Sequence, residues 1–202
     1  NLVIELLLNK NDKDYPDVAV VVTEVENIKR NLLLFTQIKD LEIPTILVIN
    51  MADQMMLKGI SLDIPKLEAA LKTRIALISS RKATGIEELK DLIVNYEMLS
   101  TEPCLNASEI DSDYFNNLRR IYPNQQLYKL WLVISQDVNF GELSKNVIQN
   151  NSFSKSEEEL KKLQHKETVK RYQYINETLK EGKKVDLTKA TDLRSKLDKI
   201  LT

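Results

Sequence analysis

The chain has 202 residues, of which 43% are hydrophobic, so it can bury a core without disulfides or metal ions. A formal net charge of −1 gives no basic field, which argues against nucleic acid as a partner. One cysteine, Cys104, and one histidine, His165, exclude an internal disulfide and a Cys/His zinc site, and they favour a reducing, cytoplasmic setting.

The first hundred residues alternate between strand and helix patterns. Short, mostly β-branched runs predict three strands, at 18–22, 45–49 and 75–78. Helical spacing between and after these runs predicts helices over 27–41, 64–71 and 85–96. This alternation predicts an α/β fold with a parallel sheet, and three strands are few enough that the sheet looks incomplete.

Beyond residue 96 only the helical period remains. A linker is expected at 101–108, around Pro103. Helices are predicted over 113–122, 125–136, 156–182 and 187–201. The sequence therefore predicts two domains, a truncated α/β domain over 1–100 and an all-α helical bundle over 101–202.

The longest predicted helix has clear ends. Ser156 and Glu159 have the spacing of a capping box, and Gly182 is the expected stop. One face is predicted to turn inward, and it carries Leu160, Leu163, Tyr172, Ile175 and Leu179. We expect Trp131 in the bundle core and His165 in solvent.

Two polar side chains follow the strand at 45–49. Asn50 and Asp53 stand three apart, at the strand end where ligands bind in open α/β sheets. The run NKND at 9–12 fits the same spacing, but it lies in a polar loop after an apolar segment that is expected to end a helix. The spacing alone is weak, and its position favours Asn50 and Asp53.

A fixed carboxylate at this place can select a purine. It accepts from two adjacent N–H groups at once, and guanine offers such a pair on its Watson–Crick edge. Adenine places a bare ring nitrogen there, which would face the carboxylate of Asp53 as a second acceptor. Asn50 can tie this loop to its neighbours, and the unbranched side chain of Met51 can cover a flat ring.

The strand at 75–78 ends in a second candidate loop. Ser79, Ser80 and Arg81 follow it, and their backbone N–H groups could meet a purine carbonyl oxygen. Other roles stay open, because Asp53 could cap the next helix and the two serines could simply form a turn. For the Arg81 side chain, exposure to solvent is the favoured interpretation.

These residues resemble known motifs. Asn50-Met51-Ala52-Asp53 resembles the base-recognition motif of Ras-like GTPases, and Ser79-Ser80-Arg81 resembles their Ser-Ala-Lys loop. The chain is similar above all to the ferrous iron transporter family FeoB, through DYPDVAVVV, NIKRNLLL, the N-M-x-D motif and KATDLRSKLDKILT at 189–202. Met51 stands where most Ras-like proteins have lysine, which is ordinary for FeoB.

The resemblance implies a Ras-like GTPase domain, a helical domain that stabilises the GDP-bound state, and a permease in the bacterial inner membrane. It implies GTP or GDP and Mg²⁺ as ligands of the intact protein. The motifs GxxxxGK[ST] and D-x-x-G, which hold phosphates and Mg²⁺, do not occur here, and we expect them before Asn1. This chain alone is therefore expected to hold no catalytic or metal-binding residue and to bind nucleotide weakly.

A second hypothesis assigns the chain to another class. It could be a non-enzymatic helical interaction module whose α/β part is a docking platform. In either case, the apolar strand at 18–22 lies at a sheet edge that invites pairing with another chain. We expect either a homo-oligomer or covering of that edge by residues 1–8.

Overall fold

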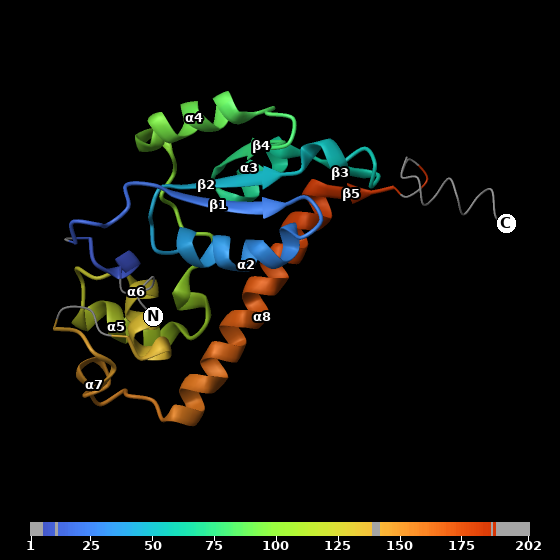
Figure 1. The fold of residues 1–202 in the computed structure, drawn as a ribbon. Helices are drawn as coiled ribbons and strands as arrows, with labels where there is room; N and C mark the ends of the chain where they lie inside the picture. Colours follow the sequence, from blue (N-terminus) through green and yellow to red (C-terminus); the bar gives the residue numbers. More distant parts are fainter. Residues whose placement is uncertain (1–5, 11, 139–141, 187, 189–202) are drawn as a thin grey trace.

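A computed structural model of the chain describes residues 6–10, 12–138, 142–186 and 188 (Figure 1). Its strands are β1 (Ala19–Glu24), β2 (Thr45–Asn50), β3 (Ile60–Leu62), β4 (Arg74–Leu77) and β5 (Lys183–Val185). Its α-helices are α2 (Ile28–Lys39), α3 (Ile64–Leu71), α4 (Ile86–Val94), α5 (Ser112–Ile121), α6 (Leu127–Gln136), α7 (Lys145–Ile148) and α8 (Glu157–Gly182). Apart from residue 188, the predicted helix over 187–201 lies outside the described residues.

The main sheet is parallel, in the order β1-β2-β4. Val21 pairs with Leu47, and Leu47 pairs with Ile75, so apolar residues line up across the strands. The central strand β2 is buried up to Ile49, as its continuous apolar run predicts. The predicted α/β fold with a parallel sheet is confirmed.

Helices cover the two faces of this sheet differently. On one face, α2, α3 and the carboxyl-terminal half of α8 pack against Leu47 and Ile49 of β2. On the other face, α4 alone packs against Ile46 and Val48 (Figure 1). Val22 of β1 points toward the second face but is 58% exposed, since no helix of the described residues extends over it.

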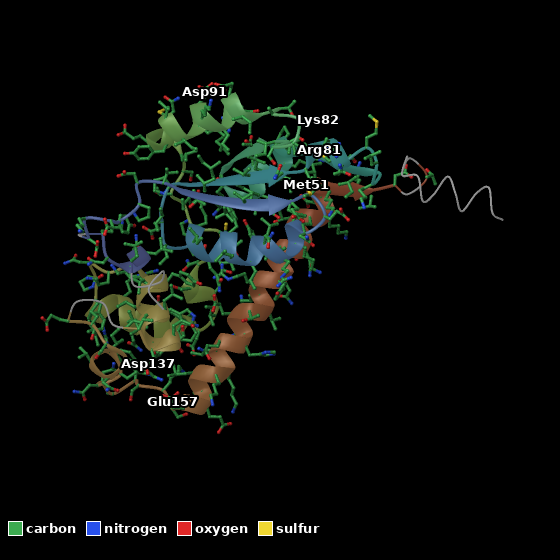
Figure 2. All side chains as sticks on the ribbon, viewed as in Figure 1. Met51, Arg81, Lys82, Asp91, Asp137 and Glu157 are labelled. Atoms are coloured by element: carbon green, nitrogen blue, oxygen red, sulfur yellow. The ribbon has the colours of Figure 1, made fainter. Side chains whose placement is uncertain are left out.

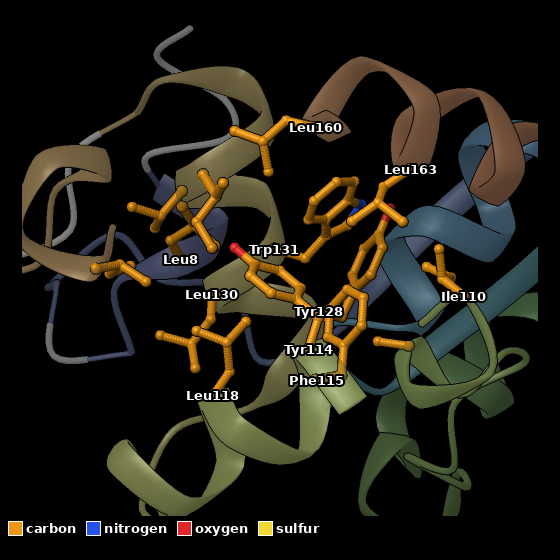
Figure 3. Packing of buried hydrophobic residues seen from close by; sticks show 14 of the residues in the cluster. Leu8, Ile110, Tyr114, Phe115, Leu118, Tyr128, Leu130, Trp131, Leu160 and Leu163 are labelled. Atoms are coloured by element: carbon orange, nitrogen blue, oxygen red, sulfur yellow. The ribbon is translucent and has the colours of Figure 1, made fainter. Parts of the chain in front are cut away.

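The helical half has its own core, built from α5, α6, α7 and the start of α8. Trp131 lies fully buried at its centre, as predicted, and Phe115 meets its ring edge-on at 5.7 Å (Figure 3). Residues from before residue 100 join this core: Leu8, Leu41 and Ile43 are buried in it, and Leu7, Tyr15 and Ala19 pack against it. The two halves of the chain therefore share buried surface.

The long helix α8 joins the two cores. It begins with the predicted capping box, in which Ser156 and Glu159 bond reciprocally, and its 26 residues end at Gly182. Its early residues pack into the helical core, and Ile175 packs under the sheet. The prediction that Tyr172 faces inward is wrong, because the buried stripe passes through Arg171 instead and leaves Tyr172 36% exposed.

Sequence patterns did not reveal the small antiparallel sheet of β3 and β5. Ile60 pairs with Val185 and Leu62 with Lys183, and the backbone N–H of Asp63 donates to Gly182 at 2.8 Å. Both strands have three residues, too few for a period of two to stand out. The pairing of β3 with β5 holds the end of α8 beside the segment that follows Asp53.

Gly182 is needed for close packing and not for a left-handed turn. A Cβ atom there would lie 2.3 Å from Cδ2 of the buried Leu67. We expect Gly182→Ala to lower the free energy of unfolding by about 1 kcal/mol, since overpacking outweighs the gain in helix propensity. Urea unfolding checks this, with the exposed neighbour change Glu181→Ala as control. A Gly182→Ala protein more stable than the parent would contradict it.

The predicted edge strand is present, and residues 6–8 do not cover it. β1 pairs with β2 on one side only among the described residues. Residues 6–8 form a helical turn instead, and Leu8 inserts into the helical core (Figures 1 and 3). Residues 6–8 thus do not provide the expected covering, because Leu8 is buried in the helical core, whereas residues 1–5 lie outside the described part of the chain and self-association stays a prediction.

Candidate functional site

The carboxyl ends of β2 and β4 bring the two predicted loops together. The strands are parallel neighbours, and the backbone N–H of Ala52 donates to the carbonyl oxygen of Ile78 at 2.9 Å. Met51 and Arg81 lie at the same end of the sheet (Figure 2). Of the rival run at 9–12, residues 9, 10 and 12 are described; they lie before the amino end of β1, away from this site, and the N–H of Asp12 donates to Asn9 at 3.0 Å.

Asp53 lies between these loops, in a short 3-10 helix after β2 (Ala52–Gln54). The Ser79 hydroxyl donates to its Oδ1 at 2.7 Å, and the Gln54 side-chain amide donates to its Oδ2 at 3.1 Å. The hydroxyl of Ser79, with help from Gln54 and Arg81, lowers the pKa of Asp53 below its ordinary value. Asp53 is therefore a carboxylate at neutral pH, and both of its oxygens already have partners.

Asn50 joins the two loops through its side chain. Its Oδ1 accepts from the backbone N–H of Ser80 at 3.1 Å and from that of Met51 at 2.8 Å. Its Nδ2 donates to the Ser80 hydroxyl at 3.0 Å. The predicted role of Asn50 as a tie between neighbouring loops is confirmed by these contacts, whereas a contact with a purine stays a prediction.

Met51 has a backbone conformation that non-glycine residues rarely adopt. Its φ of 63° and ψ of 34° are left-handed, and its side chain is 41% exposed. Such conformations cost energy and concentrate at ligand sites. Met51 therefore combines a strained backbone with a partly exposed side chain at the end of β2, and its contact with a flat ligand stays a prediction.

The serine loop is closed by its own backbone. The N–H of Ser79 donates to Thr84 at 3.0 Å, and the N–H of Thr84 donates back to Ser79 at 3.2 Å. Gly85 follows with a φ of +75°, and a Cβ atom there would lie 2.3 Å from the carbonyl oxygen of Leu77. These constraints fix where Ser79 presents its hydroxyl to Asp53.

Arg81 is the least constrained of the predicted site residues. Its side chain is 77% exposed, in agreement with the sequence interpretation, and its Nη2 lies 3.6 Å from Oδ2 of Asp53. Gln54 was missed as a site residue, since an amide one position after Asp53 gives no pattern of its own. Only the short 3-10 helix brings its side chain back to the carboxylate.

A polar hollow of about 270 Å³ lies beside this site, at the carboxyl end of β1. It is lined by Val22, Thr23, Glu24, Asn27, Arg30, Asn31 and Asn50. Asn50 is the residue that the hollow shares with the two loops.

The described residues contain no cluster of three or more metal-ligating side chains of the His, Cys, Asp and Glu types. Every helix among them is too short or too polar to cross a bilayer.

Comparison with known proteins gives consistent results. Residues 3–93 match the family model described as ferrous iron transport protein B. The Fe(2+) transporter FeoB of Leptospira biflexa is 34% identical over 93 residues, which are 46% of this chain and 13% of that protein. FeoB of Escherichia coli is 35% identical over 108 residues, or 54% of this chain and 14% of that protein. The matched segments thus span about an eighth of these relatives.

Solved structures extend the likeness to the helical half. The cytosolic domain of the T. maritima FeoB iron transporter in GDP form II has a TM-score of 0.76 at 22% identity, covering 90% of this chain and 72% of that one. The cytosolic domain of L. pneumophila FeoB has a TM-score of 0.66 at 25% identity, covering 86% and 70%. Residues 3–93 are thus similar to the FeoB family, and most of the chain has the fold of FeoB cytosolic domains.

Proposed function

We propose that this chain recognises the guanine base in the cytosolic GTPase region of a ferrous iron transporter. The observation that carries the proposal is Asp53, a carboxylate held at the meeting point of two strand-end loops by Ser79. Each carboxylate oxygen has two lone-pair sites, so Oδ1 keeps one for a ligand while Ser79 uses the other. The Asp53 side chain can then accept from the paired N–H groups of guanine.

The rest of the base would be held by the neighbouring residues. The backbone N–H groups around Ser80 and Arg81 would donate to a carbonyl oxygen of the purine, and the bond between Ser80 and Asn50 would hold that backbone in place. Met51 would cover a ring face. T. maritima FeoB cytosolic domains were solved in GDP and GMPPNP forms, which supports a guanine nucleotide as the ligand here.

The remaining chemistry lies outside this sequence. Contacts to phosphates and Mg²⁺ would come from motifs that these 202 residues do not contain, so GTP hydrolysis is proposed for the intact transporter and inactivity for this chain alone. We also propose that residues 1–100 and 101–202 are two domains. The partner would be a permease in the bacterial inner membrane, with this chain on its cytoplasmic face.

Transmission of the nucleotide state would run through the end of α8. β3 follows the Asp53 segment after a short turn, and its partner β5 follows α8 directly. Lys183 also donates to the carbonyl oxygen of Val25, just beyond β1. A shift of the base-recognition loop would therefore be passed through β3 to β5, the strand that follows α8.

The test is Asp53→Asn in the full-length protein that carries this chain. We expect GDP affinity to fall about 10- to 100-fold and xanthosine diphosphate to become the preferred ligand, since an amide matches the extra ring carbonyl of xanthine. Competition against a fluorescent guanine nucleotide measures both. The control is Asp91→Asn, an exposed change on α4 away from the site (Figure 2). An unchanged preference for guanine would favour the non-enzymatic interaction module instead.

A further inference from the structure

The Asp53 carboxylate is almost fully covered by protein atoms. Its side chain is only 6% exposed, although it belongs to a loop at the molecular surface. Its Oδ2 faces two donors, the Gln54 amide at 3.1 Å and the Arg81 guanidinium at 3.6 Å. A further N–H group that approaches Oδ2 would therefore meet the hydrogen bond from Gln54 and the charged group of Arg81, which lies close to the same oxygen.

Arg81 is the donor that leaves most easily. Its side chain is 77% exposed, so water replaces the lost contact when it moves, and 3.6 Å is longer than a hydrogen bond. Exposed ion pairs of this kind contribute little, typically up to about 1 kcal/mol. Gln54 is less free, because it is the residue next to Asp53 in the same 3-10 turn.

The two competing groups have the same chemistry. The Watson–Crick edge of guanine carries a ring N–H and an exocyclic NH₂ on one carbon, which is the N–C–N donor pattern of a guanidinium. Arg81 carries that pattern with a full positive charge, and its Nη2 lies 3.6 Å from the carboxylate that would read the base. We propose that Arg81 is an internal competitor that occupies Asp53 when the site is empty and that guanine displaces it.

This inference rests on the proposed guanine site and adds a control of its affinity. The competitor keeps the carboxylate paired between nucleotides, and it makes each binding event displace an ion pair. It thereby weakens binding and speeds release. The opposite role, in which Arg81 lies on the bound base and strengthens binding, is an outcome that the same experiment detects.

The experiment uses Arg81→Ala in the full-length protein that carries this chain. We expect GDP to bind about two- to fivefold more tightly, with most of the change in slower release, because the exposed ion pair no longer competes. The gain should shrink as KCl rises from about 50 mM to about 1 M, since salt screens the pair in the parent protein. Weaker GDP binding by Arg81→Ala would overturn the inference.

Lys82→Ala is the matched control. It removes another exposed cation from the same loop, and in the described part of the chain no ion pair joins that side chain to a carboxylate. We expect it to leave GDP affinity within twofold of the parent, about the limit of such a comparison. A gain as large as that of Arg81→Ala would mean that loop charge, and not contact with Asp53, governs affinity, and would refute the inference.

A double-mutant cycle tests competition by Arg81 separately from guanine recognition by Asp53. In the Asp53→Asn background the ion pair is absent, so adding Arg81→Ala should leave xanthosine diphosphate affinity nearly unchanged. An equal gain in both backgrounds refutes the competition. Failure of Asp53→Asn to alter base preference refutes the guanine site itself, whatever Arg81→Ala does.

Discussion

Replacement of Arg171 by methionine is expected to lower the free energy of unfolding by about 3 to 5 kcal/mol. The Arg171 side chain is 2% exposed, and its Nη1 lies 2.7 Å from Oδ2 of Asp40, whose side chain is fully buried. Its Nη2 donates to Glu167 at 2.7 Å. Methionine keeps most of the apolar stem but leaves two carboxylates in the interior without their cation.

The position of this ion pair explains why its loss should be severe. Asp40 also accepts from the backbone N–H groups of Cys104 and Leu105, at 2.7 and 3.1 Å. It thus joins the end of α2, the start of the helical half, and α8. The predicted linker at 101–108 is packed at this point, and burial raises the pKa of the Cys104 thiol to about 12.

Urea unfolding followed by circular dichroism measures the change. Lys170→Met is the matched control, because it removes a neighbouring cation whose contact with Glu109 is 3.8 Å long and half exposed. We expect that control to cost less than about 1 kcal/mol. Asp40→Asn combined with Arg171→Met should recover part of the loss. Equal effects of the Arg171 and Lys170 changes would show that burial of the pair does not matter.

Trp131→Ala is also expected to lower the free energy of unfolding by about 3 to 5 kcal/mol, since it leaves a cavity at the centre of the helical core. Trp131 is fully buried, and its Nε1 donates to Oε2 of Glu167 at 3.0 Å. The change removes the edge-to-face contact with Phe115 and leaves one oxygen of Glu167 without its donor (Figure 3).

Two further variants sharpen this test. Trp131→Phe retains a ring in the core and should cost less than Trp131→Ala. Tyr172→Ala, on the exposed side of α8, should cost little. Because Glu167 contacts both Trp131 and Arg171, the effects of changing both should not add. If Tyr172→Ala lowered the free energy of unfolding as much as Trp131→Ala, the assignment of Trp131 to the core and of Tyr172 to the surface would be wrong.

The parts of the fold that sequence patterns predicted are those set by local chemistry. The β-branched runs gave the strands to within two residues, and Asp63 caps α3 as its position before the helix suggests. The meeting of Asp53 with Ser79 was also predictable, because neighbouring parallel strands end at the same edge of a sheet.

The parts that escaped prediction depend on partners distant in the sequence. In the sequence, Arg171 looks like one more charged residue on a polar helix. It can be buried because its guanidinium pairs with Asp40, which lies 131 positions earlier in the chain. Because Arg171 was expected to be exposed, the buried face of α8 was wrongly predicted to include Tyr172. Likewise, the strand Ile60–Leu62 exists because Lys183–Val185 returns to it. Neither segment would form a strand alone.

One consequence follows from the continuity of α8 between the two cores. Its 26 residues make a rod about 39 Å long at about 1.5 Å per residue. Ile175 packs beneath the sheet and Leu160 in the helical core, so any tilt of the rod would displace one core relative to the other. A tilt of about 5° at one end would carry the other through about 3 Å, the length of one hydrogen bond.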